Sequence, residues 1–282
     1  MTTTLDAIAF KSHTHPRHKF QNLYGLIKSD LLYQSWGRMN RQSAPGVDGV
    51  TAETFQKRLP YHIQSLASRL KNKAYRAGNI KRVLIPKANG KMRPLGLPTL
   101  EDKLAQQSVA MILEALWEPH FIKGSYGYRP NKSAHQAVHS LQMNLQFGRF
   151  GYIVEADIKG FFDNMDHEWL MKMLRDKVDD EALLKLIKQW LKAKVVTPEG
   201  AKIKSTKGTP QGGVISPILA NIYLHYALDS WFEKCVKPIC QGQAMLIRYA
   251  DDFVVAFQYK DEAEQSSITG TLTEIWVGTG GG

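Results

Sequence analysis

Two adjacent aspartates, Asp251 and Asp252, lie between two short apolar runs and are the feature that most constrains this chain. The runs Ala244–Arg248 and Phe253–Phe257 are rich in β-branched and aromatic residues, so they predict a β-hairpin whose turn carries both carboxylates. Adjacent like charges repel each other, and burial raises that cost. A hard divalent cation such as Mg²⁺, which binds carboxylate oxygens, removes the cost. The alternative is a solvated turn, because Asp is common in turns.

A third aspartate, Asp157, favours the metal interpretation. The segment Gly151–Asp157 is typical of a strand that ends in this residue, and a helical pattern begins at about His167. If the strand lies beside the hairpin, the three carboxylates meet. Two cations held there activate an attacking hydroxyl and stabilise the leaving oxygen in phosphoryl transfer. We therefore expect Asp157, Asp251 and Asp252 to form a catalytic, metal-binding centre for two Mg²⁺ ions.

Several motifs, taken in chain order, resemble those of reverse transcriptases, and their residues are most similar to those of the group II intron-encoded kind. Each motif alone is weak, but several in order at plausible spacing are hard to obtain by chance. The resemblance covers roughly residues 20 to 265. The motifs are Ala156–Asp163, Gly208–Pro217 and Tyr249–Asp252, which resemble the palm, and Ala44–Val50, Lys87–Pro94 and Gly124–Pro130, which resemble the fingers and early palm.

This resemblance implies an α+β, right-hand polymerase fold with fingers and palm. The palm sheet is expected to be mixed or antiparallel, with helices packed on one face. Family members continue into a thumb that has no counterpart here, so the chain resembles a C-terminally truncated member. The expected segments are a disordered leader at 1–16, basic fingers and connecting helices at 17–150, the palm at 151–265, and a tail at 266–282 that does not match the family.

The resemblance also implies nucleotide-binding residues. Lys87 and Arg93, on a hairpin with a turn signal at Asn89–Gly90, are expected to contact the triphosphate of the incoming nucleotide. From the residues alone, binding to the template backbone and simple exposure to solvent are equally good interpretations of both side chains.

Three further positions carry such roles by resemblance. Gln211 and Gly212 are expected next to the incoming nucleotide and template, whereas a plain helix-entry loop is the alternative. Phe162 is expected beneath the sugar, where its ring would exclude a 2′-hydroxyl, whereas a core aromatic is the alternative. Tyr126 and Tyr128 fit either stacking on nucleic acid or core packing.

The positive charge is unevenly distributed. The net charge is +11, and residues 1–98 contain 17 Lys and Arg against 4 Asp and Glu, a balance of +13, which leaves −2 for the rest. This imbalance favours a polyanionic partner, with a basic solubility face as the alternative. With the resemblance, the expected partners are an RNA template (group II intron RNA), a DNA or RNA primer and deoxynucleoside triphosphates.

Apolar residues at helical spacing predict one helix over about residues 17–39 and another that Thr51 caps and that runs to about Asn72. Thr99 is expected to cap a further helix that runs to Trp117.

The remaining composition indicates a globular protein. Hydrophobic residues make up 43% of the chain, and no apolar run approaches the length of a membrane span. The N-terminus lacks the pattern of a secretory signal, so a cytoplasmic protein without membrane contact is expected. Cys235 and Cys240 do not have zinc-site spacing and are expected to be reduced thiols.

Two functions follow from the sequence. The first is the RNA-directed DNA polymerase of a group II intron, associated with intron splicing and mobility, whose activity the missing thumb puts in question. The second is a non-catalytic, maturase-like fragment that binds intron RNA. A retron or defence-type reverse transcriptase fits the Pro45–Gly49 sequence less well.

Overall fold

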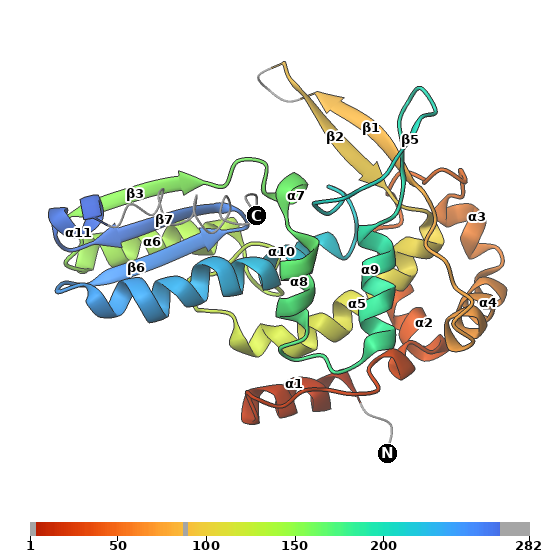
Figure 1. The fold of residues 1–282 in the computed structure, drawn as a ribbon, viewed down its shortest axis with the longest axis horizontal. Helices are drawn as coiled ribbons and strands as arrows, with labels where there is room; N and C mark the ends of the chain where they lie inside the picture. The colour runs from red at the N-terminus through yellow and green to blue at the C-terminus, as the bar shows by residue number, and fades with distance from the viewer. Residues whose placement is uncertain (1–3, 87–89, 266–282) are drawn as a thin grey trace. The chain divides into compact units, whose positions relative to one another are not determined.

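The computed structural model describes residues 4–86 and 90–265, and the chain divides into two compact units. The first unit contains Met1–Pro119 and Gly160–Leu219, and the second contains His120–Lys159 and Ala220–Gly282. Both units are discontinuous in sequence and neither coincides with the expected segments 17–150 and 151–265, whose functional assignment stays a prediction. Figure 1 shows the helices and strands of each unit. Among the described residues, no helix is long and apolar enough to cross a bilayer.

The first unit is built around helix α5, Leu100–Trp117. Thr99 caps this helix, since its side chain accepts a hydrogen bond from the Asp102 amide, as the sequence predicted. Most α5 side chains are buried, and helices α1 and α2 pack against it. The helices of the unit are α1 (Leu5–Thr14), α2 (Ser29–Arg38), α3 (Ala52–Gln56), α4 (Leu59–Lys71), α5, α7 (Phe161–Asn164), α8 (His167–Leu174), α9 (Glu181–Leu191) and the start of α10 (Ser216–Leu224), with a 3₁₀ turn at Tyr24–Leu26.

The expectation of a disordered leader over residues 1–16 is wrong for helix α1. Thr4 caps this helix, and Ile8 and Ser12 lie one turn apart on its buried face. The Ser12 hydroxyl donates a 2.7 Å hydrogen bond to the Leu116 carbonyl at the end of α5. The leader is therefore ordered by contacts with a helix about a hundred positions away, which a local polar composition does not reveal.

Two helices expected to be continuous are interrupted. The pattern over residues 17–39 yields the short 3₁₀ turn followed by α2, and the helix expected from Thr51 to about Asn72 divides into α3 and α4. Pro60 lies at the start of α4, where its missing N–H costs nothing because the first turn has no intrahelical partner for it. Thr51 caps α3, as expected.

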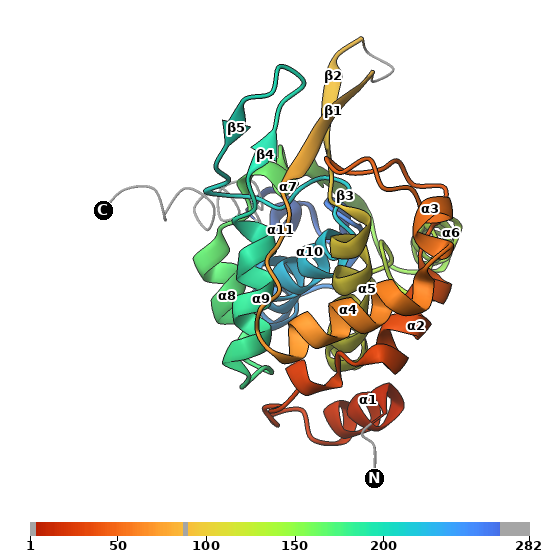
Figure 2. The same cartoon turned by 90° about the vertical axis from the view of Figure 1, so that its right-hand side faces the viewer.

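A mixed four-stranded sheet completes the first unit. Its order is β2-β1-β4-β5, with β1 (Ile80–Pro86) antiparallel to β2 (Met92–Leu97) and parallel to β4 (Val195–Val196), which pairs with β5 (Lys202–Ile203). Figure 2 shows both hairpins extending from the same side of the unit. The hairpin expected around Asn89–Gly90 is confirmed by the β1–β2 pairing.

The second unit holds an antiparallel three-stranded sheet of order β3-β7-β6. The α+β class expected from the sequence is confirmed. Side chains Phe253, Val255 and Phe257 of the central strand are buried on one face of this sheet. The elements are α6 (Ala134–Phe147), β3 (Tyr152–Asp157), two π-helical turns that continue α10 at His225–Asp229 and Phe232–Val236, β6 (Ala244–Tyr249), β7 (Asp252–Phe257) and α11 (Lys260–Gln265).

Candidate active site

The end of the three-stranded sheet brings two of the predicted carboxylates together. Asp157, the last residue of β3, pairs with Asp252, the first residue of β7, and Asp252 pairs in turn with Tyr249 of β6. Residues directly opposite each other in an antiparallel pair have Cβ atoms about 4.5–5.5 Å apart, and their side chains share one face. The proximity that the sequence hypothesis required is therefore present, and the catalytic role of these residues stays a prediction.

Asp251 lies in the turn that joins β6 to β7. It is half-buried and follows Ala250, which has φ = 59° in the left-handed region. An L-residue in that region costs about 1–2 kcal/mol, so other contacts must hold the turn in place. The hairpin thus presents two consecutive carboxylates from a conformation that the local sequence does not favour.

The electrostatic environment of Asp252 is unfavourable for its charge. Partial burial raises the pKa of its carboxyl, and the charges of Asp157 and then Glu155 raise it further. Glu155 was not singled out from the sequence, although it lies two positions before Asp157 in a strand and so shares its face. The alternation within Glu155–Asp157 was the signal that could have identified it. Like charges that raise a pKa in this way create a place where a cation is stabilising.

The donor chemistry fits a hard divalent cation. The part of the chain that the structure describes contains no group of three or more His, Cys, Asp or Glu side chains arranged as a ready-made metal site. Mg²⁺ does not require such a group, because it keeps several water ligands and binds through one or two carboxylates plus substrate phosphates. The oxygen-only pair Asp157 and Asp252, with Asp251 adjacent in the chain, satisfies that requirement.

The predicted triphosphate contacts lie on the β1–β2 hairpin of the first unit. Arg93 is exposed on β2, opposite Ile85 of β1. Lys87 falls outside the described residues. Their assignment to the triphosphate stays a prediction.

Gln211 and Gly212 form part of a loop that is joined to the base of this hairpin. The Gly96 amide of β2 donates a 2.7 Å hydrogen bond to the Gln211 carbonyl, and the Gln211 side-chain amide donates to Asp163 over 3.4 Å. Gly212 has φ = 103°, and an added Cβ would lie 2.9 Å from the Gly96 carbonyl oxygen. A side chain at this position would therefore be strained, which explains the glycine.

Phe162 is half-buried in the short helix α7, and its neighbour Phe161 fills the core instead. Phe161 is 1% exposed, and the two rings meet edge to face with centroids 5.4 Å apart. The Thr209 amide donates a 2.7 Å hydrogen bond to the Phe162 carbonyl, so the glycine-containing loop also holds this aromatic segment. Phe162, Gln211 and Arg93 thus belong to elements that contact one another within the first unit.

The two tyrosines left open by the sequence differ in environment. Tyr126 is buried against Ala137 of α6 and Ile247 of β6, so it is a core residue. Tyr128 is 47% exposed and has φ = 57°. Only Tyr128 therefore retains an exposed ring of the kind that stacks on a base.

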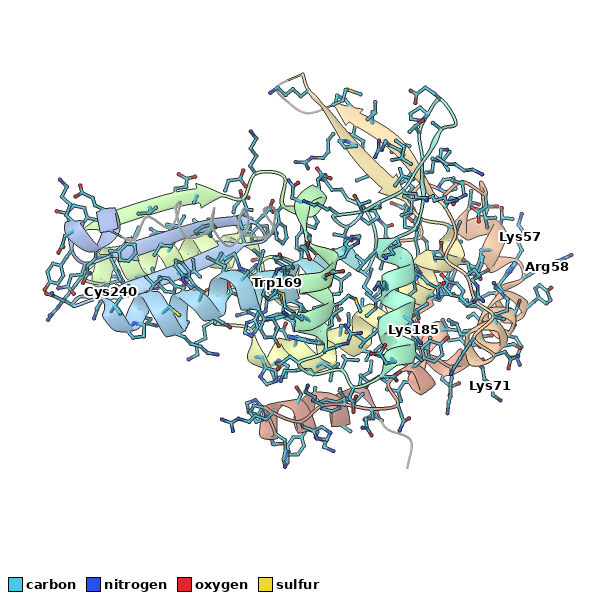
Figure 3. All side chains as sticks on the ribbon, in the orientation of Figure 1. Lys57, Arg58, Lys71, Trp169, Lys185 and Cys240 are labelled. Atoms are coloured by element: carbon cyan, nitrogen blue, oxygen red, sulfur yellow. The ribbon has the colours of Figure 1, made fainter. Side chains whose placement is uncertain are left out.

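Exposed basic side chains cover part of the first unit. Figure 3 shows Lys57, Arg58, Lys71 and Lys185 extending away from the ribbon, and all four are exposed. They belong to the segment from α3 to α4 and to α9. This surface has the charge expected for a polyanion partner, with affinity that falls as salt rises.

Comparison with known proteins gives matches along most of the chain. The family described as reverse transcriptase (RNA-dependent DNA polymerase) matches residues 85–273. Protein YkfC of Escherichia coli strain K12 is 33% identical over 276 residues, which are 86% of this chain and 72% of YkfC. The group II intron-encoded protein LtrA of Lactococcus lactis subsp. cremoris is 37% identical over 223 residues, which are 78% of this chain but 37% of LtrA. An uncharacterised 91 kDa protein in a cob intron of Schizosaccharomyces pombe is 34% identical over 82% of this chain and 28% of its own length.

Proposed function

Because the chain belongs to the reverse transcriptase family, and within it resembles the group II intron-encoded proteins, we propose that it extends a primer on RNA by phosphoryl transfer. Family members use a divalent metal ion and act on a nucleic acid template and primer. The observation that carries the proposal is the pairing of Asp157 with Asp252 at the end of the sheet.

In this proposal the three aspartates hold two Mg²⁺ ions. When bound, the ions would neutralise phosphate charge and lower the pKa of the attacking primer hydroxyl. Asp157 and Asp252 would supply oxygen ligands from adjacent strands, and Asp251 would supply them from the turn. Partial burial and the charges of Asp157 and Glu155 raise the pKa of Asp252, and bound ions would relieve this repulsion.

The first unit supplies nucleotide recognition in the same proposal. Lys87 and Arg93 compensate the triphosphate charge of a deoxynucleoside triphosphate, and Gln211 with Gly212 lies along the base and template. Phe162 packs against the sugar and disfavours a 2′-hydroxyl. The hydrogen bonds from Gly96 to Gln211 and from Thr209 to Phe162 support this arrangement, because they tie the separate elements to one another.

A second candidate is a non-catalytic protein that binds group II intron RNA. Its support is the +13 balance of residues 1–98 and the exposed basic surface of the first unit. The chain also spans 37% of the length of LtrA, so the activity of that whole protein does not transfer automatically.

Primer extension on an RNA template with Mg²⁺ and deoxynucleotides separates the two candidates. We expect Asp157→Ala and Asp251→Ala each to reduce extension by at least about 100-fold, the loss typical of removing a preorganised charge-stabilising group. RNA affinity should change little. Asp261→Ala, an exposed aspartate of α11 in the same unit, is the matched control and should extend normally. Salt-sensitive RNA binding without extension by the unaltered protein would support the second candidate instead.

A further inference from the structure

Arg248, the last residue before Tyr249, is a fully buried charge. Its side chain and that of Asp229 are both 0% exposed, and they form a bidentate pair in which Nε and Nη2 each donate a 2.8 Å hydrogen bond. Nη2 also donates to the Ser125 hydroxyl over 2.8 Å, and Nη1 donates to the Asn221 side-chain oxygen over 3.0 Å. The arginine thus joins three separate positions of the second unit.

The remaining donor holds the turn that carries the aspartates. Nη1 of Arg248 donates a 3.0 Å hydrogen bond to the carbonyl oxygen of Ala250. Ala250 is the residue in the left-handed conformation, and its carbonyl belongs to the peptide bond that leads into Asp251. The hydrogen bond therefore fixes the orientation of the peptide immediately before the two consecutive carboxylates.

A second segment also contacts this turn. The Asn221 side-chain amide donates a 2.8 Å hydrogen bond to the Gly127 carbonyl, and a Cβ added at Gly127 would lie 2.2 Å from the Ala250 amide nitrogen. The segment containing Gly127 thus packs directly against the turn, and Arg248 forms a hydrogen bond to the same turn. Both contacts act on the backbone of Ala250.

An arginine–aspartate pair at this buried position indicates that Arg248 orients the turn rather than that it adds to the stability of the fold. A buried ion pair is often no more stabilising than apolar side chains of the same volume, because desolvation offsets the attraction. Arg presents five donors in a rigid planar fork, whereas Lys presents a point charge on a flexible stem. Only the fork can hold Asp229 with two donors and still reach Ala250, Asn221 and Ser125.

We propose that Arg248, oriented by Asp229 and Asn221, is a positioning residue that holds the Ala250 peptide so that Asp251 and Asp252 are preorganised for a divalent cation. This inference rests on the proposed metal-dependent function. It predicts that removing the hydrogen bonds of Arg248 lowers the affinity for the cation by more than the accompanying loss of folding stability explains.

The test measures the affinity of the purified chain for Mn²⁺ by electron paramagnetic resonance. The melting temperature of each variant is measured alongside to report the stability of its fold. Arg248→Lys keeps the charge but loses the fork, and we expect Mn²⁺ binding to weaken about 10-fold. Asn221→Ala removes the bond to Nη1 and the bond to the Gly127 carbonyl, and should give a smaller shift in the same direction, which keeps the test valid if Arg248→Lys does not fold. Ser125→Ala removes a bond to Nη2 but leaves the Ala250 contact, so its Mn²⁺ affinity should stay within about twofold of the unaltered chain.

The outcomes separate this inference from the proposed function. Mn²⁺ affinity that follows melting temperature equally in all three variants, or that is unchanged in Arg248→Lys and Asn221→Ala, overturns the positioning role. Mn²⁺ binding that does not depend on Asp252 also overturns it. If the unaltered chain binds Mn²⁺ through Asp252 but extends no primer, the polymerase proposal fails while the Mn²⁺ affinities still decide the role of Arg248. Where extension is observed, Arg248→Lys should require about 10-fold more Mg²⁺ at unchanged primer–template affinity.

Discussion

Replacing Asp252 with Asn should stabilise the metal-free protein at neutral pH. Asp252 is directly opposite Asp157, so their Cβ atoms lie about 5 Å apart, and unit charges at that separation repel by roughly 1 kcal/mol in water and about 3 kcal/mol at an effective dielectric constant of 20. Both side chains are exposed, so we take the lower value. A gain of about 1 kcal/mol corresponds to a melting temperature about 2–4 °C higher.

The pH dependence of this effect has a defined sign. The folded-state pKa of Asp252 is raised, so the folded protein binds the proton more tightly than the unfolded chain does. The repulsion is therefore absent in acid and develops as the pH rises from the ordinary Asp value of 3.8 through the raised pKa. The gain from Asp252→Asn should disappear in acid.

Thermal denaturation in chelator and in Mg²⁺ checks the reasoning. Mg²⁺ should raise the melting temperature of the unaltered protein more than that of Asp252→Asn, because the variant lacks one of the proposed ligands. Asp261→Asn is the control and should respond to Mg²⁺ as the unaltered protein does. A lower melting temperature for Asp252→Asn in chelator, or equal stabilisation of both proteins by Mg²⁺, would refute the argument that repulsion at this site is relieved by a cation.

Three further predictions concern the scaffold. Burial lowers the pKa of His225 from 6.5 to about 4, so roughly 3 kcal/mol of stability present above pH 6.5 should be lost as the pH falls from 6.5 to 4. In denaturant unfolding at a series of pH values, the free energy of unfolding of His225→Leu should depend less on pH than that of the unaltered protein. An equal pH dependence would contradict the assignment. Gly127→Ala should destabilise by about 1–3 kcal/mol and weaken Mn²⁺ binding, since the new Cβ meets the Ala250 amide; an unchanged melting temperature would show that the segment yields freely. Ser12→Ala should cost about 1 kcal/mol through the lost bond to Leu116, and equal chemical-denaturation midpoints for variant and unaltered protein would show that this hydrogen bond contributes nothing to stability.

Local patterns alone predicted much of this fold. The caps at Thr51 and Thr99, the β1–β2 hairpin and the hairpin that carries Asp251 and Asp252 all depend on residues within a few positions of one another. Capping and turn chemistry are short-range, so they can be inferred directly from the sequence. The order of the motifs likewise indicated the family that the comparisons show.

Tertiary contacts decided the rest, because they join residues that no periodicity relates. Helix α1 is ordered by α5, although its own sequence resembles a polar leader. Nothing local marks Arg248 as buried, since a lone arginine after an apolar run normally reaches solvent, and here its partner Ser125 is 123 positions away. The order of residues indicated the carboxylates and the strand ends that carry them. The pairing of β3 with β7 placed Asp157 opposite Asp252, and folding buried Arg248 where it bonds the Ala250 carbonyl, because register and burial are properties of the packed chain.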